Sequence, residues 1–359
     1  MAARHFSIPC LAQTPEGVTR RYPCGVPLDV VVSDLLLPPQ ASESLRQLRL
    51  PYLERWIARG RTERVEAAGA TAWLAQRFGL DAPIPVAAVS LAADDAPRDG
   101  TWLRADPVHL QVSSEVVALH DASVLDIHRD EAATLSAVLQ QHFAADGFEL
   151  VAPHPSRWYA RVPEGEIPRT TPLVAAIGRN VFGLLPQGRG RVNWASAITE
   201  AQMLMSTHAV NVEREERGRP AINSVWFWGE GALPTDVRSP YAIVYADDAF
   251  ARGLGKLGGA RVAETPKTPD NIDMVHDDES VLVVLDTLTA PLHRGDGEAW
   301  VAAARRLDEE WFDKVTRLVE RFDGVRIVLP GRQETRATSV DNASRWRWFR
   351  TRSPINAHA

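Results

Sequence analysis

Four apolar runs of strand length constrain the fold of this chain more than any other feature. The runs are LDVVVSDLLL (28–37), YAIVYAD (241–247), SVLVVLDTL (280–288) and VRIVLP (325–330). An unbroken apolar run is typical of a strand buried on both faces in a parallel sheet, because a strand with one wet face alternates apolar and polar residues. Helical spacing at 248–257 and 298–322 separates the later runs, as expected for parallel connections. We therefore predict an α/β core.

The residues between the first run and the other three have a different pattern. They follow a polar linker, DDAPRDG (94–100). The predicted elements are a hairpin of strands at 102–112 and 116–121, a helix at 127–145, a strand at 148–162, and a helix at 193–208 with Asn193 as its N-cap. This mixture predicts a compact α+β unit inserted into the core.

A further apolar run, SVWFWG (224–229), is assigned to the parallel sheet. The predicted organisation is an α/β core of residues 28–95 plus 221–350, an α+β cap domain inserted at 100–215, and an irregular, proline-rich arm at 1–27. The buried aromatics Trp226 and Trp228 are interpreted as core residues, since large aromatics on a buried strand usually are.

Composition excludes several classes of function. The net charge is −6, so no basic field attracts nucleic acid or anionic membranes. No window approaches the roughly 20 apolar residues of a membrane span, and Cys10 and Cys24 form no CxxC pair and read as free thiols. We expect a cytoplasmic protein.

The segment RWRWFRTR (345–352) predicts an edge strand protected by arginines, with single-stranded nucleic acid binding as the alternative.

Several motifs carry a resemblance to a known family. The segment GRPAINSVWFWGEGALP (218–234) resembles the Ala-Asn-x-x-Trp-x-Trp-Gly-x-Gly segment of archaeal-type cofactor-independent phosphoglycerate mutases, and HAVNVEREERG (208–218) resembles their Pro-Val-Asn-x-x-Arg stretch. The segments RADPVHL, SRWY and EAQMLM are similar to a bacterial group of RpfE-type, phosphoglycerate mutase-like regulatory proteins. The resemblance implies an alkaline-phosphatase-like fold, with a mostly parallel sheet flanked by helices and an inserted α+β cap domain.

The resemblance also implies a two-metal phosphoryl transfer, in which the metals stabilise the attacking and leaving oxygens. Asp34 matches the first metal ligand, and Thr71 is the candidate nucleophile, with a buried helical threonine as the alternative. In LTAPLHRGD (288–296), His293 matches the histidine of the late motif, but Thr289 occupies its aspartate position. The last Asp-His pair is replaced by Gly331-Arg332, and a guanidinium cannot coordinate a metal.

Too few ligands therefore remain for two metals. The residual candidates are Asp34, Asp286, His293 and Asp296. We expect no metal cofactor, and manganese or zinc only under the alternative of a rearranged site.

Other residues are candidates for binding a phosphorylated ligand, because guanidinium and amide groups match phosphate and carboxylate. In the cap these are Arg104, His109 and Arg157, and near the domain junction they are Asn211, Arg214 and Asn223. Arg332, after the last core strand, could supply a positive charge where the resemblance places metals. The alternative is that they form structural hydrogen-bond networks.

The sequence thus predicts a degenerate mutase-like protein, without mutase activity, that binds a small anion or a protein partner in a regulatory role. The alternatives are a working metal-dependent phosphoglycerate mutase or phosphatase, and an interaction module that uses the basic aromatic C-terminal segment.

Overall fold

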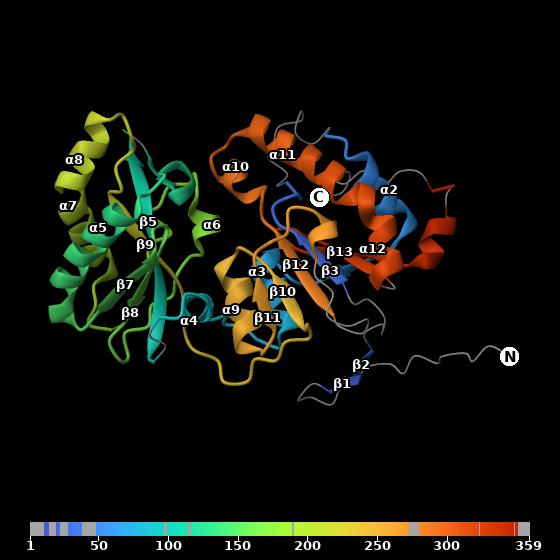
Figure 1. Ribbon diagram of the computed structural model, residues 1–359. Coiled ribbons are helices and arrows are strands. Elements are labelled where there is room, and N and C mark those ends of the chain that lie inside the picture. Colours follow the sequence, from blue (N-terminus) through green and yellow to red (C-terminus); the bar gives the residue numbers. More distant parts are fainter. Residues whose placement is uncertain are drawn as a thin grey trace.

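The computed structural model places two domains side by side (Figure 1). The core contains residues 28–37 and 48–93 and the C-terminal third of the chain, and the cap is formed by the middle of the chain. The described residues are 11–13, 19–21, 28–37, 48–96, 99–113, 116–188, 190–272, 280–322, 324–347 and 349–350.

The core is built on a seven-stranded sheet in the order β11-β10-β12-β3-β13-β14-β4. Its first five strands run parallel, and β14 is antiparallel to both of its neighbours. The strands are β3 (Leu28–Val32), β4 (Arg61–Val65), β10 (Ile243–Tyr245), β11 (Arg261–Ala263), β12 (Val281–Leu285), β13 (Val325–Pro330) and β14 (Thr335–Val340). The four apolar runs of the sequence therefore pair as a parallel sheet, which confirms the predicted α/β class.

Helices cover both faces of this sheet, which is why its strands are apolar throughout. Val30 and Val32 of β3 pack on one side, and Val31 packs on the other, because successive side chains of a strand alternate. One face carries α2 (Pro51–Arg59), α11 (Gly297–Glu310) and α12 (Val315–Phe322). The other carries α3 (Gly69–Arg77), α4 (Val86–Ala93) and α9 (Ala249–Leu257). No helix in the described ranges is long and apolar enough to cross a membrane.

The cap has a five-stranded antiparallel sheet, in which β9 pairs with the long strand β5. Its strands are β5 (Thr101–Val112), β6 (Val117–His120), β7 (Glu149–His154), β8 (Arg157–Arg161) and β9 (Ser224–Ala232). Its helices are α5 (Arg129–Phe143), α6 (Leu173–Ala176), α7 (Trp194–Ser206) and α8 (Ala209–Glu216). Helices α5 and α7 pack on one face, and α6 lies on the side that faces the core (Figure 1).

The assignment of SVWFWG to the core sheet was wrong. The segment forms β9, which pairs with β5, so the cap continues to Ala232 and the core resumes after it. The run is apolar because both faces of β9 are covered inside the cap. Phe227 packs with the α5 and α7 side, and Trp226 packs on the opposite side. Trp226 is therefore a core residue of the cap, as predicted for its side chain.

Other predicted elements differ in detail. The expected strand at 148–162 is a hairpin, β7 and β8, and the edge strand β4 was not predicted because its residues are charged. Residues 342–346 form a 3₁₀ helix instead of an edge strand. In the arm, Leu11–Gln13 and Thr19–Arg21 pair as antiparallel strands β1 and β2, so it is not wholly irregular. Cys10, Cys24 and residues 351–352 lie outside the described residues.

The remaining short elements connect the larger ones. A helix of five residues, α10 (Thr289–His293), follows β12. The 3₁₀ helices are η1 (Ala122–Val124), η2 (Ala144–Asp146), η3 (Pro269–Asn271), η4 (Phe312–Lys314) and η5 (Asn342–Trp346). Of these, α10 and η1 matter for the site, since they contact each other across the two domains.

Candidate functional site

Carboxylates gather where the parallel core strands end. Asp34 follows β3, Asp247 and Asp248 follow β10, and Asp286 follows β12. The carboxyl edge of an open α/β sheet is where ligands of such folds bind. Burial raises the pKa of Asp286 to about 6, and the negative charges of Asp248, Asp247 and Asp34 add to this effect. The ends of β10 and β12 therefore disfavour a further negative charge.

Asp34 is held by groups of its own domain. Its backbone has a φ of 58°, in the left-handed region that aspartate tolerates better than most residues. The hydroxyl of Thr289 donates to Asp34 Oδ2 at 2.6 Å, and the indole of Trp300 donates to its carbonyl at 3.1 Å. Thr289 thus places a hydrogen-bond donor against Asp34 where the resembling motif has an aspartate.

His293 joins the core to the cap. Its Nδ1 lies 2.7 Å from Asp121 Oδ2, at the N-terminus of η1, and Asp121 also accepts from Ser123. Burial opposes the charge on both partners, but their hydrogen bond outweighs it, so the pKa of His293 is raised and that of Asp121 is lowered. The Nε2 of His293 is buried and has no hydrogen-bond partner.

Asp296 and Arg332 have local structural environments of their own. Asp296 is the N-cap of α11, and its carboxylate accepts from the amide of Ala299 at 2.9 Å. Arg332 is exposed in the turn between β13 and β14, where the amide of Gly331 donates to the carbonyl of Glu334 at 3.0 Å. A tight hairpin turn therefore stands where the resemblance implies an Asp-His pair of metal ligands.

Thr71 lies in the first turn of α3 and is half-buried, not fully buried as the structural alternative supposed. No side chain caps this helix, because Ala68 stands at the N-cap. The amide of Gly69 donates to the carbonyl of Gly331 at 2.8 Å, which brings the first turn of α3 beside the turn that carries Arg332.

The cap arginines are already paired. Arg104 donates to Asp106 at 2.6 Å, and its guanidinium lies over the rings of Tyr159 and Trp228. Burial opposes the charge of Arg104, but Asp106 outweighs it and raises the pKa of Arg104.

The second cap arginine, Arg157, pairs with Asp94 at the start of the linker. Arg157 donates to Asp94 at 2.7 Å, and the hydroxyl of Tyr159 donates to the same carboxylate at 2.9 Å. Burial alone would raise the pKa of Asp94, but the hydrogen bond and charge of Arg157 lower it. Arg104 and Arg157 thus form hydrogen-bond networks inside the protein, which is the alternative to ligand binding.

The junction residues have structural partners as well. The amide of Asn211 bonds to backbone groups of Met205 and Ile222, and its side chain is fully buried. Asn223 bridges the backbone N–H and carbonyl of Leu110.

Arg214 and His109 are also engaged inside the cap. Arg214 is 1% exposed and donates to Glu131 and to the carbonyls of Pro220 and Leu125. His109 Nδ1 lies 2.8 Å from the carbonyl of Ala221. Of the predicted ligand-binding residues, Arg332 alone is exposed at the carboxyl edge of the core sheet, within the part of the chain that is described.

The donor set does not fit a two-metal centre. Across the described ranges, no group of three His, Cys, Asp or Glu side chains is arranged to hold a metal ion. Asp34 is bound by Thr289, and His293 is turned toward Asp121 through Nδ1. The Nε2 of His293, which has no hydrogen-bond partner, retains the character of a ligand.

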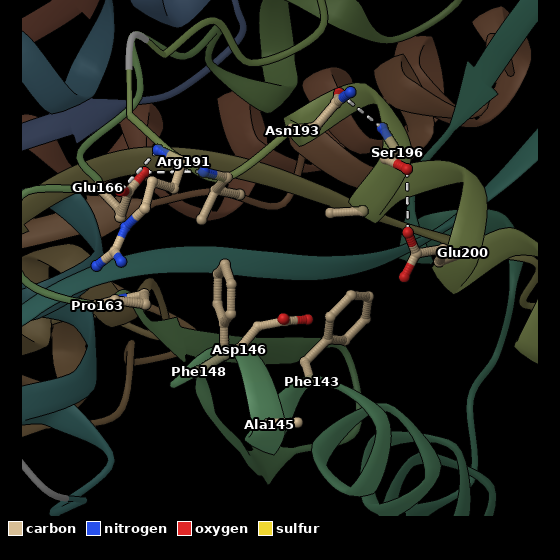
Figure 2. Close-up of a pocket in the computed structure, with 12 residues that line it drawn as sticks. Phe143, Ala145, Asp146, Phe148, Pro163, Glu166, Arg191, Asn193, Ser196 and Glu200 are labelled. Carbon is tan, nitrogen blue, oxygen red and sulfur yellow. Dashed lines mark hydrogen bonds between the residues drawn. The ribbon is translucent and has the colours of Figure 1, made fainter.

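A groove of about 490 Å³ lies in the cap, away from these residues. Figure 2 shows it between Phe143, Asp146 and Phe148 on one side and Arg191 and Glu200 on the other. Its other acidic residue is used internally, since Glu166 accepts from two backbone amides. None of the predicted site residues lines this groove.

The fold is an α/β core with a mostly parallel sheet, into which an α+β cap is inserted. No family model matches the chain. The 2,3-bisphosphoglycerate-independent phosphoglycerate mutase of Methanosarcina acetivorans is 26% identical over 306 residues, which is 80% of this chain and 75% of that enzyme. The enzyme of the same name from Methanosarcina barkeri is 29% identical over 166 residues, and this match spans 45% of the chain and 40% of that enzyme.

Among solved structures, the PH0037 protein from Pyrococcus horikoshii has a TM-score of 0.52 and 13% identity, with 88% of this chain and 87% of that chain covered. At this identity the likeness concerns the fold alone. The chain is therefore related to the cofactor-independent phosphoglycerate mutases at low identity, and its fold confirms the predicted architecture.

Four acidic neighbours of predicted site residues were missed by sequence reasoning. Asp121, Asp94 and the pair Asp247–Asp248 all contact or influence predicted residues. Asp247 and Asp248 directly follow a predicted parallel strand, and that position was a usable signal. No sequence signal connects Asp121 with His293, which lies 172 residues later.

Proposed function

We propose that this chain is a relative of the cofactor-independent phosphoglycerate mutases that lacks mutase activity and binds a small anionic ligand in a regulatory role. The proposed lack of mutase activity is supported by the hydrogen bond from Thr289 to Asp34. A metal ligand of the relatives' type requires a carboxylate free to face a cation, together with further donors around it. Here the hydroxyl of Thr289 occupies the aspartate position of the late motif, and Gly331-Arg332 occupies the position of the last Asp-His pair.

The anion is proposed to bind beside Arg332. This guanidinium is exposed, it presents a fork of donors that matches phosphate or carboxylate, and it lies beside the uncapped first turn of α3. In the sheet, β13 is separated from β10 by β3 and β12, so the charges of Asp247 and Asp248 lie on the far side. The hydroxyl of Thr71, in the same first turn, is proposed to contact the ligand without attacking it.

The ligand half is tested by the thermal stability of the full chain with 3-phosphoglycerate and with inorganic phosphate. We expect a rise in Tm that is lost in Arg332→Ala and kept in Arg217→Ala, which removes an exposed charge from α8. An unchanged shift in Arg332→Ala contradicts the assigned position.

The catalytic half is tested separately by a mutase and phosphatase assay in Mn²⁺ and in Zn²⁺. We expect no turnover above that of the Asp34→Asn variant. Turnover that depends on metal and on Asp34 would establish the alternative, a working phosphotransferase with a rearranged site at Asp34, Asp286 and His293.

A further inference from the structure

Two histidines face each other on the hairpin of the cap, outside the site described above. His109 on β5 lies directly opposite His120 on β6 in the antiparallel register. Opposite residues project to the same face of the sheet, with Cβ atoms about 4.5–5.5 Å apart. The two ring centres are 6.2 Å apart, their planes are inclined by 40°, and both side chains are half-buried. The backbone ladder therefore holds two imidazoles together without a ligand.

The hydrogen bonds of the two rings determine where their lone pairs lie. His109 Nδ1 is 2.8 Å from the carbonyl oxygen of Ala221, which can only accept, so Nδ1 carries the proton and Nε2 carries the lone pair. His120 Nε2 is 3.0 Å from Gln111 Oε1, which likewise accepts, so the lone pair of His120 is on Nδ1. A metal-ligating histidine commonly donates its other ring N–H to a carbonyl in this way, which orients the ring.

We propose that His109 and His120 form a binding site for a divalent transition-metal ion of the class that imidazole prefers, represented by Zn²⁺. The ion is coordinated by Nε2 of His109 and Nδ1 of His120, at about 2.0–2.1 Å from each. In the proposed complex the two half-buried rings turn so that these atoms meet at one ion. Since no third His, Cys, Asp or Glu completes a cluster in the described ranges, water or a donor from a bound molecule occupies the other positions.

This site is independent of the proposed anion site. It lies on the β5–β6 hairpin of the cap, whereas Arg332 is in the β13–β14 turn of the core. It adjoins the contact between the domains, because the residue after His120 is Asp121, the partner of His293.

The test is a calorimetric titration of the full chain with Zn²⁺ alone, compared between variants. His120→Ala is expected to weaken Zn²⁺ binding at this site at least about tenfold. Gln111→Ala changes an exposed residue and removes the hydrogen-bond partner of His120, and it is expected to weaken binding about tenfold. His142→Ala is the matched control, since this exposed histidine of the cap pairs with Glu200 and lies outside the proposed site. The Zn²⁺ affinity of this variant is expected to equal that of the parent.

A second readout is the electron paramagnetic resonance spectrum of the Cu²⁺-loaded chain. We expect the signature of two nitrogen ligands in the parent protein and of one in His120→Ala. Zn²⁺ affinity that is equal in the parent, His120→Ala and Gln111→Ala, or no stoichiometric binding in the parent, would overturn the proposal.

Discussion

His293 of the core and Asp121 of the cap are joined by a hydrogen bond of 2.7 Å, and both side chains are largely buried. The pair connects α10, which follows the core strand β12, to η1, which follows the cap strand β6. A residue that the resemblance implies as a metal ligand is therefore used, through one of its nitrogens, to hold the two domains against each other.

This contact is expected to make stability depend on pH. The raised pKa of His293 means that its contribution is complete below its unfolded value of about 6.5 and is lost as the pH rises through the folded value. The lowered pKa of Asp121 means that its contribution is present above about pH 3.9 and is lost as the pH falls through the folded value. The contact is thus strongest between about pH 4 and 6.5.

Asp121→Asn measures this effect, because asparagine can still cap η1. We expect the difference in Tm between the parent and the variant to be largest near pH 5.5 and to shrink toward pH 9. A difference that is constant over this range would show that the ion pair contributes nothing beyond a neutral hydrogen bond.

Restoring the missing carboxylate should create a need for metal. In Thr289→Asp, a second carboxylate replaces a hydroxyl that lies 2.6 Å from Asp34, so two like charges meet. We expect a lower Tm than in the parent without metal, and recovery on addition of Mn²⁺. Thr289→Asn, of similar size and without charge, is the control and should respond to neither. An unaltered Tm in Thr289→Asp would mean that Asp34 is not held as described.

Arg214 is expected to act on stability rather than on ligand binding. Its guanidinium is 1% exposed and donates to Glu131 and to two carbonyls, so Arg214→Ala leaves the carbonyl of the buried Leu125 without this donor, while Glu131 keeps the amide of His128. Leaving a buried acceptor without its donor costs about 1–3 kcal/mol of the free energy of unfolding. Arg217→Ala, which removes an exposed ion pair one turn away, should cost less than about 1 kcal/mol. Chemical denaturation of both variants tests the contrast.

The packing of α4 on α9 depends on Gly253. A Cβ atom at this position would collide with the backbone carbonyl of Val89, which cannot move like a side-chain end. We expect Gly253→Ala to lower the free energy of unfolding by about 1–3 kcal/mol, although alanine favours a helix by about 1 kcal/mol over glycine. Gly183→Ala, where a Cβ meets open space, should change it by less than about 0.5 kcal/mol. Equal effects of the two changes would contradict the packing described.

Local patterns predicted most of the elements. The helix at Trp194–Ser206 begins after Asn193, whose side chain accepts from the amide of Ser196, as an N-cap does. The hairpin of β5 and β6 also lies where alternation placed it. In contrast, β4 has a charged sequence and becomes a strand only because β14 pairs with it.

The sequence by itself determined the α/β class of the core, because that class depends on which residue types are present and how they alternate. The shortage of metal ligands is what the family resemblance implies, and it stays a prediction. Only the tertiary structure decided that β9 belongs to the cap, since an apolar run is compatible with any sheet that buries both of its faces. It also decided that Arg104 and Arg157 are neutralised by Asp106 and Asp94, and that His293 meets Asp121. Pairings between distant residues depend on how the domains pack, and no local pattern records that.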